Sequence, residues 1–528
     1  MPKLECMRIL VTEKLAESGL DLLREAGHDV DVQLGLSPEE LLEAIVGAHG
    51  VIIRSATQIT AEVIEASDVL QVVGRAGVGL DNVDTEAATA AGVIVSNAPT
   101  SNSVSAAEHT LAMLLAVARN VPQAHAALVE GRWERSNWSG VELMDKTLGI
   151  VGLGNIGGIV AVRAKAFGMR LIGHDPFVSP ERAAELGVEL MGIDELVAEA
   201  DFLTLHLART PETIDLINAD RLKLAKPNLR IVNVARGGII NEADLAAAVE
   251  AGAIAGAALD VFDSEPKTES PLFDLPQVVV TPHLGASTAE AQTRAGETIA
   301  EQVRLALAGD FVPFAVNVAA RGVPEVVRPF LPLAELLGAQ FSRLVEAPTS
   351  IDVVFAGEIG GMDCRMAELA VTKGLMSQRA DVPVSYVNAE DLAEQHGVKI
   401  NTRATTKTPS GLVNGIKVEG EGHSIAGTID LLTGGARIIS VDGITIELPS
   451  SEHLLLVLNE DQPGMIGKVG TIFGEADINI DDMHLGQSST GEVALMALAT
   501  TVEIPEVIVA KLNELPQVIS VRDISVPQ

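Results

Sequence analysis

The chain has 528 residues, which is too long for one hydrophobic core, so several domains are expected. Its 72 acidic and 37 basic residues give a net charge of −35, which excludes general nucleic-acid binding and demands a local basic pocket for any anionic substrate. Its two cysteines, Cys6 and Cys364, exclude a disulfide framework and a zinc cluster. No segment, including the start Met1–Cys6, is apolar over enough residues to be a signal peptide or to span a membrane. A cytoplasmic protein without a membrane segment is therefore predicted.

The first part of the chain alternates short apolar segments with helical patterns. Strands are predicted over 8–11, 29–32, 50–53 and 71–73, and helices over 13–25, 38–46, 61–65 and 101–119. Such alternation predicts a parallel sheet with helices on its faces.

A glycine motif follows the next predicted strand, which covers 148–151. The segment Gly152-Leu153-Gly154-Asn155-Ile156-Gly157 leads into a helix that should end near Phe167. The three glycines suit a tight turn, a close approach to a pyrophosphate and close packing of helix on strand, and the helix N-terminus attracts phosphates. Asp175 ends the following strand, 18 residues beyond Gly157. A carboxylate there accepts ribose hydroxyls and repels a 2′-phosphate, so the motif predicts NAD rather than NADP.

Three polar residues lie at later strand ends, where open α/β sheets place their sites. They are Arg236 after an apolar strand, Glu265 before Pro266, and His283 after Pro282. Each alone has a simple alternative: a surface arginine, a solvated glutamate or a structural histidine. In this order after the glycine motif, they suggest an anion clamp, an orienting acid and a base.

The second half of the chain has a different pattern of predicted strands and helices. After a long helix over 289–308, strands are expected over 350–355, 414–419, 424–429 and 437–448, and helices over 362–379 and 389–395. From residue 453 the predicted order is strand, helix, strand, strand, helix, strand, a ferredoxin-like βαββαβ arrangement.

These motifs resemble the D-2-hydroxyacid dehydrogenases. The resemblance rests on the glycine motif and on the segments Arg75–Asp84, Asn97–Asn102, Ala107–His109, Asn233–Gly238, Asp260–Pro266 and Thr281–Thr288. With the long C-terminal part, it extends to the long-form phosphoglycerate dehydrogenases over essentially the whole chain. It implies a Rossmann-type NAD domain (99–286) inserted in a flavodoxin-like substrate domain (1–98 and 287–316). An α+β intervening domain (317–452) and a ferredoxin-like ACT domain (453–528) are expected to follow.

The resemblance also implies roles for single residues. His283 is expected to take the proton of the C2 hydroxyl, Glu265 to hydrogen-bond His283 and favour its protonated form, and Arg236 to bind the substrate carboxylate. The expected cofactor contacts are Gly152, Gly154, Asn155, Ile156, Gly157, Asp175, Val234, Ala235, Arg236, Asp260, His283, Leu284, Gly285 and Ala286. His109 and His206 are expected to be structural, and no metal is expected.

A phosphorylated substrate needs additional cations. Arg54 and Arg75 end strands near the expected cleft, with Gly77 close by, and Arg135 follows Arg132 between the long helix and the cofactor strand. Arg54, Arg75, Gly77 and Arg135 are therefore candidates for substrate contact, with Arg54 favoured over Arg135, and the alternative for each arginine is a surface charge.

The ACT resemblance implies a module that pairs with its own copy and binds an amino acid. Asn459, Asp461 and Asn479 match serine-contacting positions, whereas Gln462 departs from the arginine common in this loop. Feedback by L-serine and a homotetramer are expected.

The predicted function is NAD-dependent oxidation of 3-phospho-D-glycerate to 3-phosphooxypyruvate, which is the first step of L-serine biosynthesis. Two alternatives remain: a D-2-hydroxyacid dehydrogenase for an unphosphorylated acid such as glyoxylate or D-lactate, and a non-catalytic NAD-sensing regulator. The presence of Arg236, Glu265 and His283 together disfavours the regulator.

Overall fold

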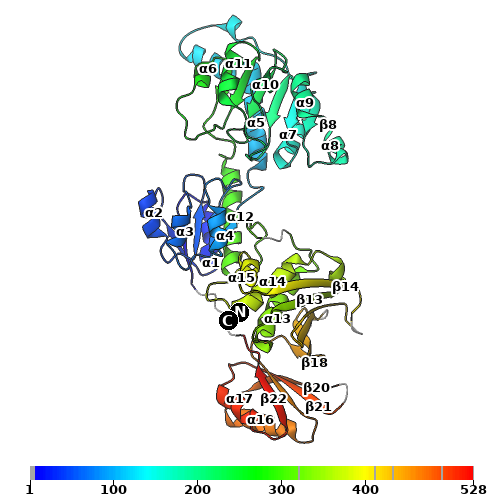
Figure 1. The fold of residues 1–528 in the computed structure, drawn as a ribbon. Coiled ribbons are helices and arrows are strands. Elements are labelled where there is room, and N and C mark those ends of the chain that lie inside the picture. The colour runs from blue at the N-terminus through cyan, green and yellow to red at the C-terminus, as the bar shows by residue number, and fades with distance from the viewer. Residues whose placement is uncertain (1–5, 319–321, 409–411, 431–432, 489–490, 527–528) are drawn as a thin grey trace.

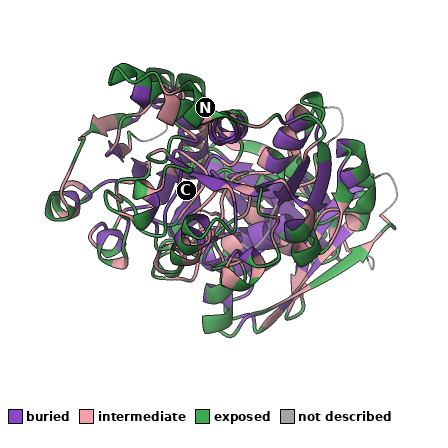
Figure 2. Ribbon diagram, turned by 90° about the horizontal axis from the view of Figure 1, so that it is seen from above, coloured by how far each residue is buried: buried purple, intermediate pink, exposed green. Residues whose placement is uncertain are grey.

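A computed structural model describes residues 6–318, 322–408, 412–430, 433–488 and 491–526. Residues 1–5, over which no signal peptide is expected, lie outside the described residues. Figure 1 shows four sheet-based units arranged along an elongated molecule, with the C-terminal unit at one end. Figure 2 shows that buried residues concentrate along the strands and exposed residues on the outer helices. No helix in the described ranges combines the length and the apolar character needed to cross a membrane.

The first unit is a parallel sheet of order β2-β1-β3-β4-β5, the flavodoxin-like order. Its elements are β1 (Arg8–Val11), α1 (Glu17–Glu25), β2 (Asp29–Val32), α2 (Pro38–Ala44), β3 (Gly50–Ile53), α3 (Ala61–Glu65), β4 (Val72–Arg75), α4 (Thr85–Ala90) and β5 (Ile94–Ser96). The helix predicted from residue 13 begins only at Glu17, because the Glu13 carboxylate is drawn away to accept backbone hydrogen bonds from the loop after β3.

The second unit is a parallel sheet of order β12-β11-β10-β9-β6-β7-β8. Its strands are β6 (Thr147–Val151), β7 (Arg170–His174), β8 (Glu189–Leu190), β9 (Phe202–Leu205), β10 (Arg230–Asn233), β11 (Gly256–Leu259) and β12 (Val278–Val280). Its helices are α5 (Ser103–Arg119), α6 (Val121–Val129), η1 (Arg135–Trp138), α7 (Asn155–Ala166), α8 (Pro180–Leu186), α9 (Ile193–Glu199), α10 (Ala219–Leu222), α11 (Glu242–Glu250) and η2 (Pro271–Asp274). The strand order reverses between β6 and β9, which is where such sheets bind dinucleotides.

Two crossings join these units. The chain leaves the first unit after β5 to enter α5, and α12 (Ala289–Leu307) brings it back to pack on α1 and β4 (Figure 1). Helices α1 and α12 meet at Gly19 and Gly296, where a Cβ on Gly19 would lie 2.7 Å from the Gly296 carbonyl oxygen. The predicted insertion of one unit into the other is therefore confirmed as a feature of the fold.

The third unit is a mixed sheet of order β14-β13-β15-β16-β17-β18. Its elements are η3 (Arg328–Phe330), α13 (Leu331–Leu344), β13 (Ser350–Gly357), η4 (Ile359–Gly361), α14 (Arg365–Ser377), α15 (Ala389–Gln395), β14 (Lys399–Thr405), β15 (Asn414–Gly420), β16 (His423–Ile429), β17 (Ala436–Val441) and β18 (Ile444–Pro449). The single strand predicted over 437–448 is wrong, because Asp442 and Gly443 take positive φ values of 49° and 75° and turn it into a hairpin.

The fourth unit confirms the predicted βαββαβ order. Its sheet has the order β20-β21-β19-β22. Its elements are β19 (Leu454–Glu460), α16 (Met465–Glu475), β20 (Ile480–Gln487), β21 (Val493–Thr500), α17 (Glu506–Asn513) and β22 (Val518–Asp523). The boundaries predicted at 98/99, 286/287, 316/317 and 452/453 all fall between elements, and as domain limits they stay predictions.

Candidate active site

The three predicted chemical residues follow three adjacent strands. Arg236 comes after β10, Glu265 after β11 and His283 after β12, and these strands pair in parallel. Because the carboxyl ends of parallel neighbours share one edge of a sheet, the topology brings the three segments together. Packing confirms this for the backbone, since a Cβ at Gly237 would collide with the carbonyl of Phe262.

The His283 and Glu265 side chains form a close pair. Nδ1 of His283 lies 2.5 Å from Oε2 of Glu265, and the backbone amide of Phe262 donates to Oε1 at 2.9 Å. Partial burial raises the pKa of the Glu265 carboxyl, but the hydrogen bonds from His283 and Phe262 outweigh it, so its pKa lies below the ordinary value. The ionised Glu265 carboxylate thus accepts a hydrogen bond from Nδ1–H of His283, and the second ring nitrogen, Nε2, lies on the other side of the ring.

The turn that carries His283 is fastened to Asp260. This residue is completely buried, and its carbonyl accepts the His283 amide at 2.8 Å. Its carboxylate accepts the amides of Leu284 at 2.7 Å and Gly285 at 2.8 Å. His283 has a φ of 54°, an uncommon conformation for a residue other than glycine. Asp260, predicted to line the nicotinamide, therefore also shapes the turn of the expected base.

The Arg236 side chain contacts the loop after β4 of the first unit. Its Nη1 donates to the Ala235 carbonyl at 2.8 Å, and its Nε lies 3.5 Å from Oδ2 of Asp81. A Cβ at Gly79 would collide with the Arg236 guanidinium. The loop after β4 is thus shaped to receive the Arg236 side chain, and its role as an anion clamp stays a prediction.

A second guanidinium lies beside it. Burial lowers the pKa of Arg75 to about 10, with Arg236 and Arg54 acting in the same sense and the carboxylates of Asp81 and Glu13 opposing. The Nε of Arg75 is buried and has no hydrogen-bond partner in the described part of the chain. A Cβ at Gly77 would collide with this guanidinium. Such a cluster of cations, one of them incompletely hydrogen-bonded, fits an anion.

Arg135 does not join this cluster. It begins η1 and lines a separate hollow of about 900 Å³ together with Arg119, Trp133 and Trp138. Its neighbour Arg132 is paired with Glu130 and Glu134. Figure 1 shows α6, which leads to η1, at the end of the second unit remote from the first. In the described chain Arg135 lines a hollow that does not include Arg54, Arg75 or Arg236, so its contact with a substrate stays a prediction.

The glycine motif forms an open cradle. Gly152 has a φ of 92°, and a Cβ there would collide with the His206 carbonyl, whereas a Cβ at Gly154 would meet no atom within 4 Å. Helix α7 begins directly after Gly154, so its free amides face this open space. Oδ2 of Asp175 accepts the Leu153 amide at 2.8 Å, which places the carboxylate beside the turn. These residues fit a dinucleotide with its pyrophosphate at α7 and its ribose at Asp175.

His206 lies next to the glycine motif, where its carbonyl faces Gly152. Burial lowers its pKa to about 4, so the ring is neutral near pH 7, and its Nε2 lies 3.1 Å from the Thr204 hydroxyl. The contacts agree with the expected structural role.

Two residues near the arginine cluster were not predicted. Oε1 of Glu13 accepts the amides of Arg54 at 2.8 Å and Thr57 at 3.0 Å. The side-chain amide of Asn82 donates to the carbonyls of the same two residues, at 2.9 and 2.6 Å. The loop that bears Arg54 is therefore clamped from both sides. No sequence signal reveals this, because its partners come from distant segments.

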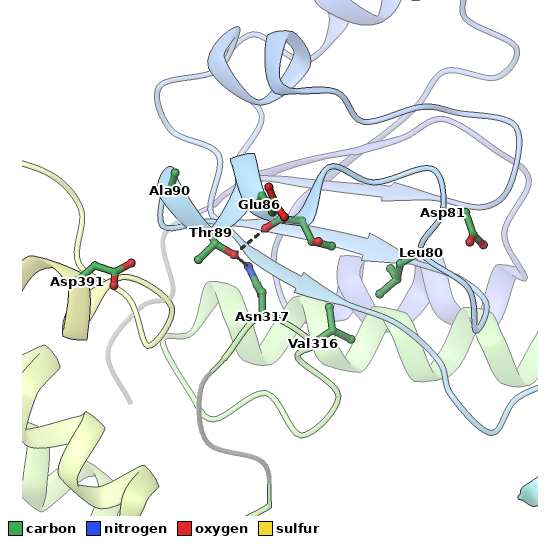
Figure 3. Close-up of a pocket in the computed structure, with 9 residues that line it drawn as sticks. Leu80, Asp81, Glu86, Thr89, Ala90, Val316, Asn317 and Asp391 are labelled. Carbon is green, nitrogen blue, oxygen red and sulfur yellow. Dashed lines mark hydrogen bonds between the residues drawn. The ribbon is translucent and has the colours of Figure 1, made fainter. Parts of the chain in front are cut away.

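A further hollow of about 710 Å³ lies between the first unit and α15. Its lining residues are Leu80, Asp81, Thr85, Glu86, Thr89, Ala90, Val316, Asn317 and Asp391. Figure 3 shows Asp391 of the third unit across from Thr89, whose hydroxyl accepts from the Asn317 amide. The three carboxylates of Asp81, Glu86 and Asp391 make this hollow unsuitable for an anionic substrate.

Two of the predicted effector residues, Asn459 and Asp461, lie at the β19–α16 loop, whereas Asn479 precedes β20 and lies at the opposite end of the sheet. Asn459 is buried, and its Oδ1 has no partner in the described ranges. Asp461 accepts from Gln487 at 2.6 Å, and exposed Asn479 donates to Asp481 at 3.0 Å. Within the described residues, no group of histidine, cysteine or acidic side chains could hold a metal ion.

Three family profiles match the chain. The D-isomer specific 2-hydroxyacid dehydrogenase NAD binding domain matches residues 111–285, the D-3-phosphoglycerate dehydrogenase intervening domain matches 326–442, and the ACT domain matches 453–517. Two similar relatives are named D-3-phosphoglycerate dehydrogenase. The one from Mycobacterium leprae is 46% identical over 94% of this chain and 95% of its own. The one from Methanocaldococcus jannaschii is 40% identical over 98% of this chain and 99% of its own.

Solved structures resemble the first two units. A protein from Thermus thermophilus is 39% identical, with a TM-score of 0.55 over 59% of this chain and all of its own, 100%. A glyoxylate reductase from Paecilomyes thermophila is 29% identical, with a TM-score of 0.53 over 58% of this chain and 96% of its own.

Proposed function

The chain belongs to the D-3-phosphoglycerate dehydrogenase family, and from this premise we propose that it oxidises 3-phospho-D-glycerate to 3-phosphooxypyruvate with NAD, the first step of L-serine biosynthesis. The observation that carries the proposal is the ionised Glu265–His283 pair at the sheet edge that also bears Arg236, with Arg75 close to both Arg236 and Arg54. This arrangement combines a base with cations for an acid that bears two anionic groups.

Each side chain has a distinct task in this proposal. A bound NAD would be held by the glycine motif and Asp175 and would supply the acceptor for the hydride from C2 of the substrate. His283 takes the hydroxyl proton on Nε2, since Glu265 retains the Nδ1 proton. Arg236 binds the carboxylate and polarises the C2 oxygen, because its planar fork matches a carboxylate. Arg75 and Arg54 bind the phosphate.

The Arg54 guanidinium is expected to select the phosphorylated substrate. Arg54→Ala should lower kcat/KM for 3-phospho-D-glycerate about 10- to 100-fold, because a hydrogen bond to a charged group contributes about 1.5–3 kcal/mol. The same variant should change kcat/KM for D-glycerate less than about twofold, since that substrate lacks the phosphate. Steady-state kinetics with both acids measure the difference.

Arg182→Ala is the matched control, because Arg182 is exposed on α8 and pairs only locally with Glu185. A wild-type preference for glyoxylate or D-lactate that survives in Arg54→Ala would favour the alternative of an unphosphorylated acid. Binding of NAD without turnover of any hydroxyacid would favour the regulator.

We further propose that the fourth unit binds L-serine and that two copies pair through it in a cytoplasmic homotetramer. The buried Oδ1 of Asn459, which has no partner in the described chain, supports this proposal because the ammonium group of an amino acid could donate to it. Asp461 supplies a carboxylate in the adjacent loop.

L-serine is expected to inhibit turnover, and Asp461→Ala should raise the half-inhibitory concentration about tenfold by removing one charged contact. Inhibition curves with L-serine, and with D-serine as the control ligand, test this. Equal effects of the two enantiomers would contradict a specific effector site, and light scattering reports the number of subunits.

A further inference from the structure

Residues 281–288, which carry His283, are held at both ends by helix α5. At the first end, the Thr281 hydroxyl donates a hydrogen bond to Oδ1 of Asp260 at 2.6 Å. At the other end, Thr288 accepts the Ala291 amide at 3.1 Å as the N-cap of α12. Both threonines also contact helix α5.

The contact at the first end involves His109. Its Nε2 lies 3.1 Å from the Thr281 hydroxyl and 3.2 Å from Oδ1 of Asp260. Since the Thr281 hydroxyl and the Asp260 carboxylate both have lone pairs facing this nitrogen, Nε2 must carry a hydrogen and donate. Burial raises the pKa of Asp260, but hydrogen bonds from His109 and Thr281 outweigh it, so its pKa lies below the ordinary value. His109 therefore stabilises the charge that fastens the turn.

The contact at the other end involves Ser105. Its buried hydroxyl lies 2.8 Å from the hydroxyl of Thr288. Ser105 and His109 are four residues apart and so occupy the same face of α5. At the start of α5, the Ser101 carbonyl accepts from Nε of Arg294 in α12 at 3.0 Å. One face of α5 thus contacts both ends of the segment 281–288, and the turn before α5 contacts the returning helix α12.

We propose that α5 positions the proton-transfer turn, with His109 and Ser105 as positioning residues that act through Asp260, Thr281 and Thr288. The φ of His283 is strained, so contacts with the surrounding residues must hold the backbone in this conformation. The ends of the strands supply some of these contacts, and α5 supplies the others. The inference rests on the proposed oxidation, and it adds to the reaction two residues that act through the turn of His283.

The test compares His109→Leu, which keeps bulk but removes the donor, with His109→Gln, whose amide nitrogen can occupy the position of Nε2. His109→Leu should lower kcat about tenfold with KM for 3-phospho-D-glycerate within about twofold, since one hydrogen bond to a buried charge is lost. The deuterium isotope effect on kcat with C2-deuterated substrate should rise, because a misplaced base slows the chemical step. His109→Gln should restore most of kcat and the isotope effect.

Ser105→Ala and the double variant complete the experiment. If both residues act on one segment, their effects on kcat should be non-additive. His125→Leu, an exposed histidine on α6, is the matched control and should behave as the wild type. Wild-type kcat in His109→Leu, or a lower kcat with an unchanged isotope effect, would overturn the inference. Failure of the wild type to oxidise 3-phospho-D-glycerate would instead reject the proposed function before any variant is compared.

Discussion

Replacing His283 with asparagine is expected to lower kcat about 10³-fold, which lies in the range that general base catalysis contributes. The asparagine amide cannot accept the C2 hydroxyl proton, whereas the glycine cradle at Gly154 is untouched. NAD affinity, measured by calorimetry, should therefore stay within about twofold. Stopped-flow absorbance of NADH measures the loss directly.

Glu265→Gln serves as the control for that result. Its amide can still bond His283, but it lacks the charge that favours the protonated ring. The pKa of the Glu265 carboxyl is lowered, so the carboxylate is ionised at neutral pH, and a neutral amide in its place should lower kcat, but by less than His283→Asn does. A His283→Asn enzyme with near wild-type oxidation, or a Glu265→Gln enzyme with unchanged kcat, would contradict the assigned pair.

Replacing Arg236 with lysine is expected to lower kcat/KM about 10²- to 10³-fold although the charge is kept. Lysine offers a point charge, whereas the guanidinium donates two parallel hydrogen bonds to a carboxylate and can reach the C2 oxygen. Gly79 leaves room for the planar guanidinium of Arg236, because any side chain at position 79 would collide with it. Steady-state kinetics with 3-phospho-D-glycerate give the magnitude.

Arg182→Lys on the exposed α8 should leave kcat/KM unchanged. The loss in Arg236→Lys should appear in both kcat and KM, because the side chain both holds the ground-state carboxylate and polarises the reacting oxygen. A rise in KM alone would limit Arg236 to binding, and an unchanged kcat/KM would remove it from the site.

Local patterns in the sequence determined much of this protein. The strand-to-helix alternation predicted both parallel sheets, and parallel neighbours necessarily bring the segments after β10, β11 and β12 to one edge. The glycine spacing and Asp175 predicted the NAD cradle. Each of these features depends on residues close in the chain, or on a topology that short connections impose.

The tertiary structure alone decided the remainder. It separated Arg135 from Arg54 and Arg75, although the sequence offered all three as candidates, because Arg135 lines a hollow with Arg119, Trp133 and Trp138. It also brought Glu13 to the Arg54 loop and His109 to Asp260, contacts between segments that are 41 and more than 100 residues apart. The spacing of apolar residues along a helix or strand predicts which face of that element is buried. The polar partner of a side chain depends instead on how the sheet-based units pack against each other.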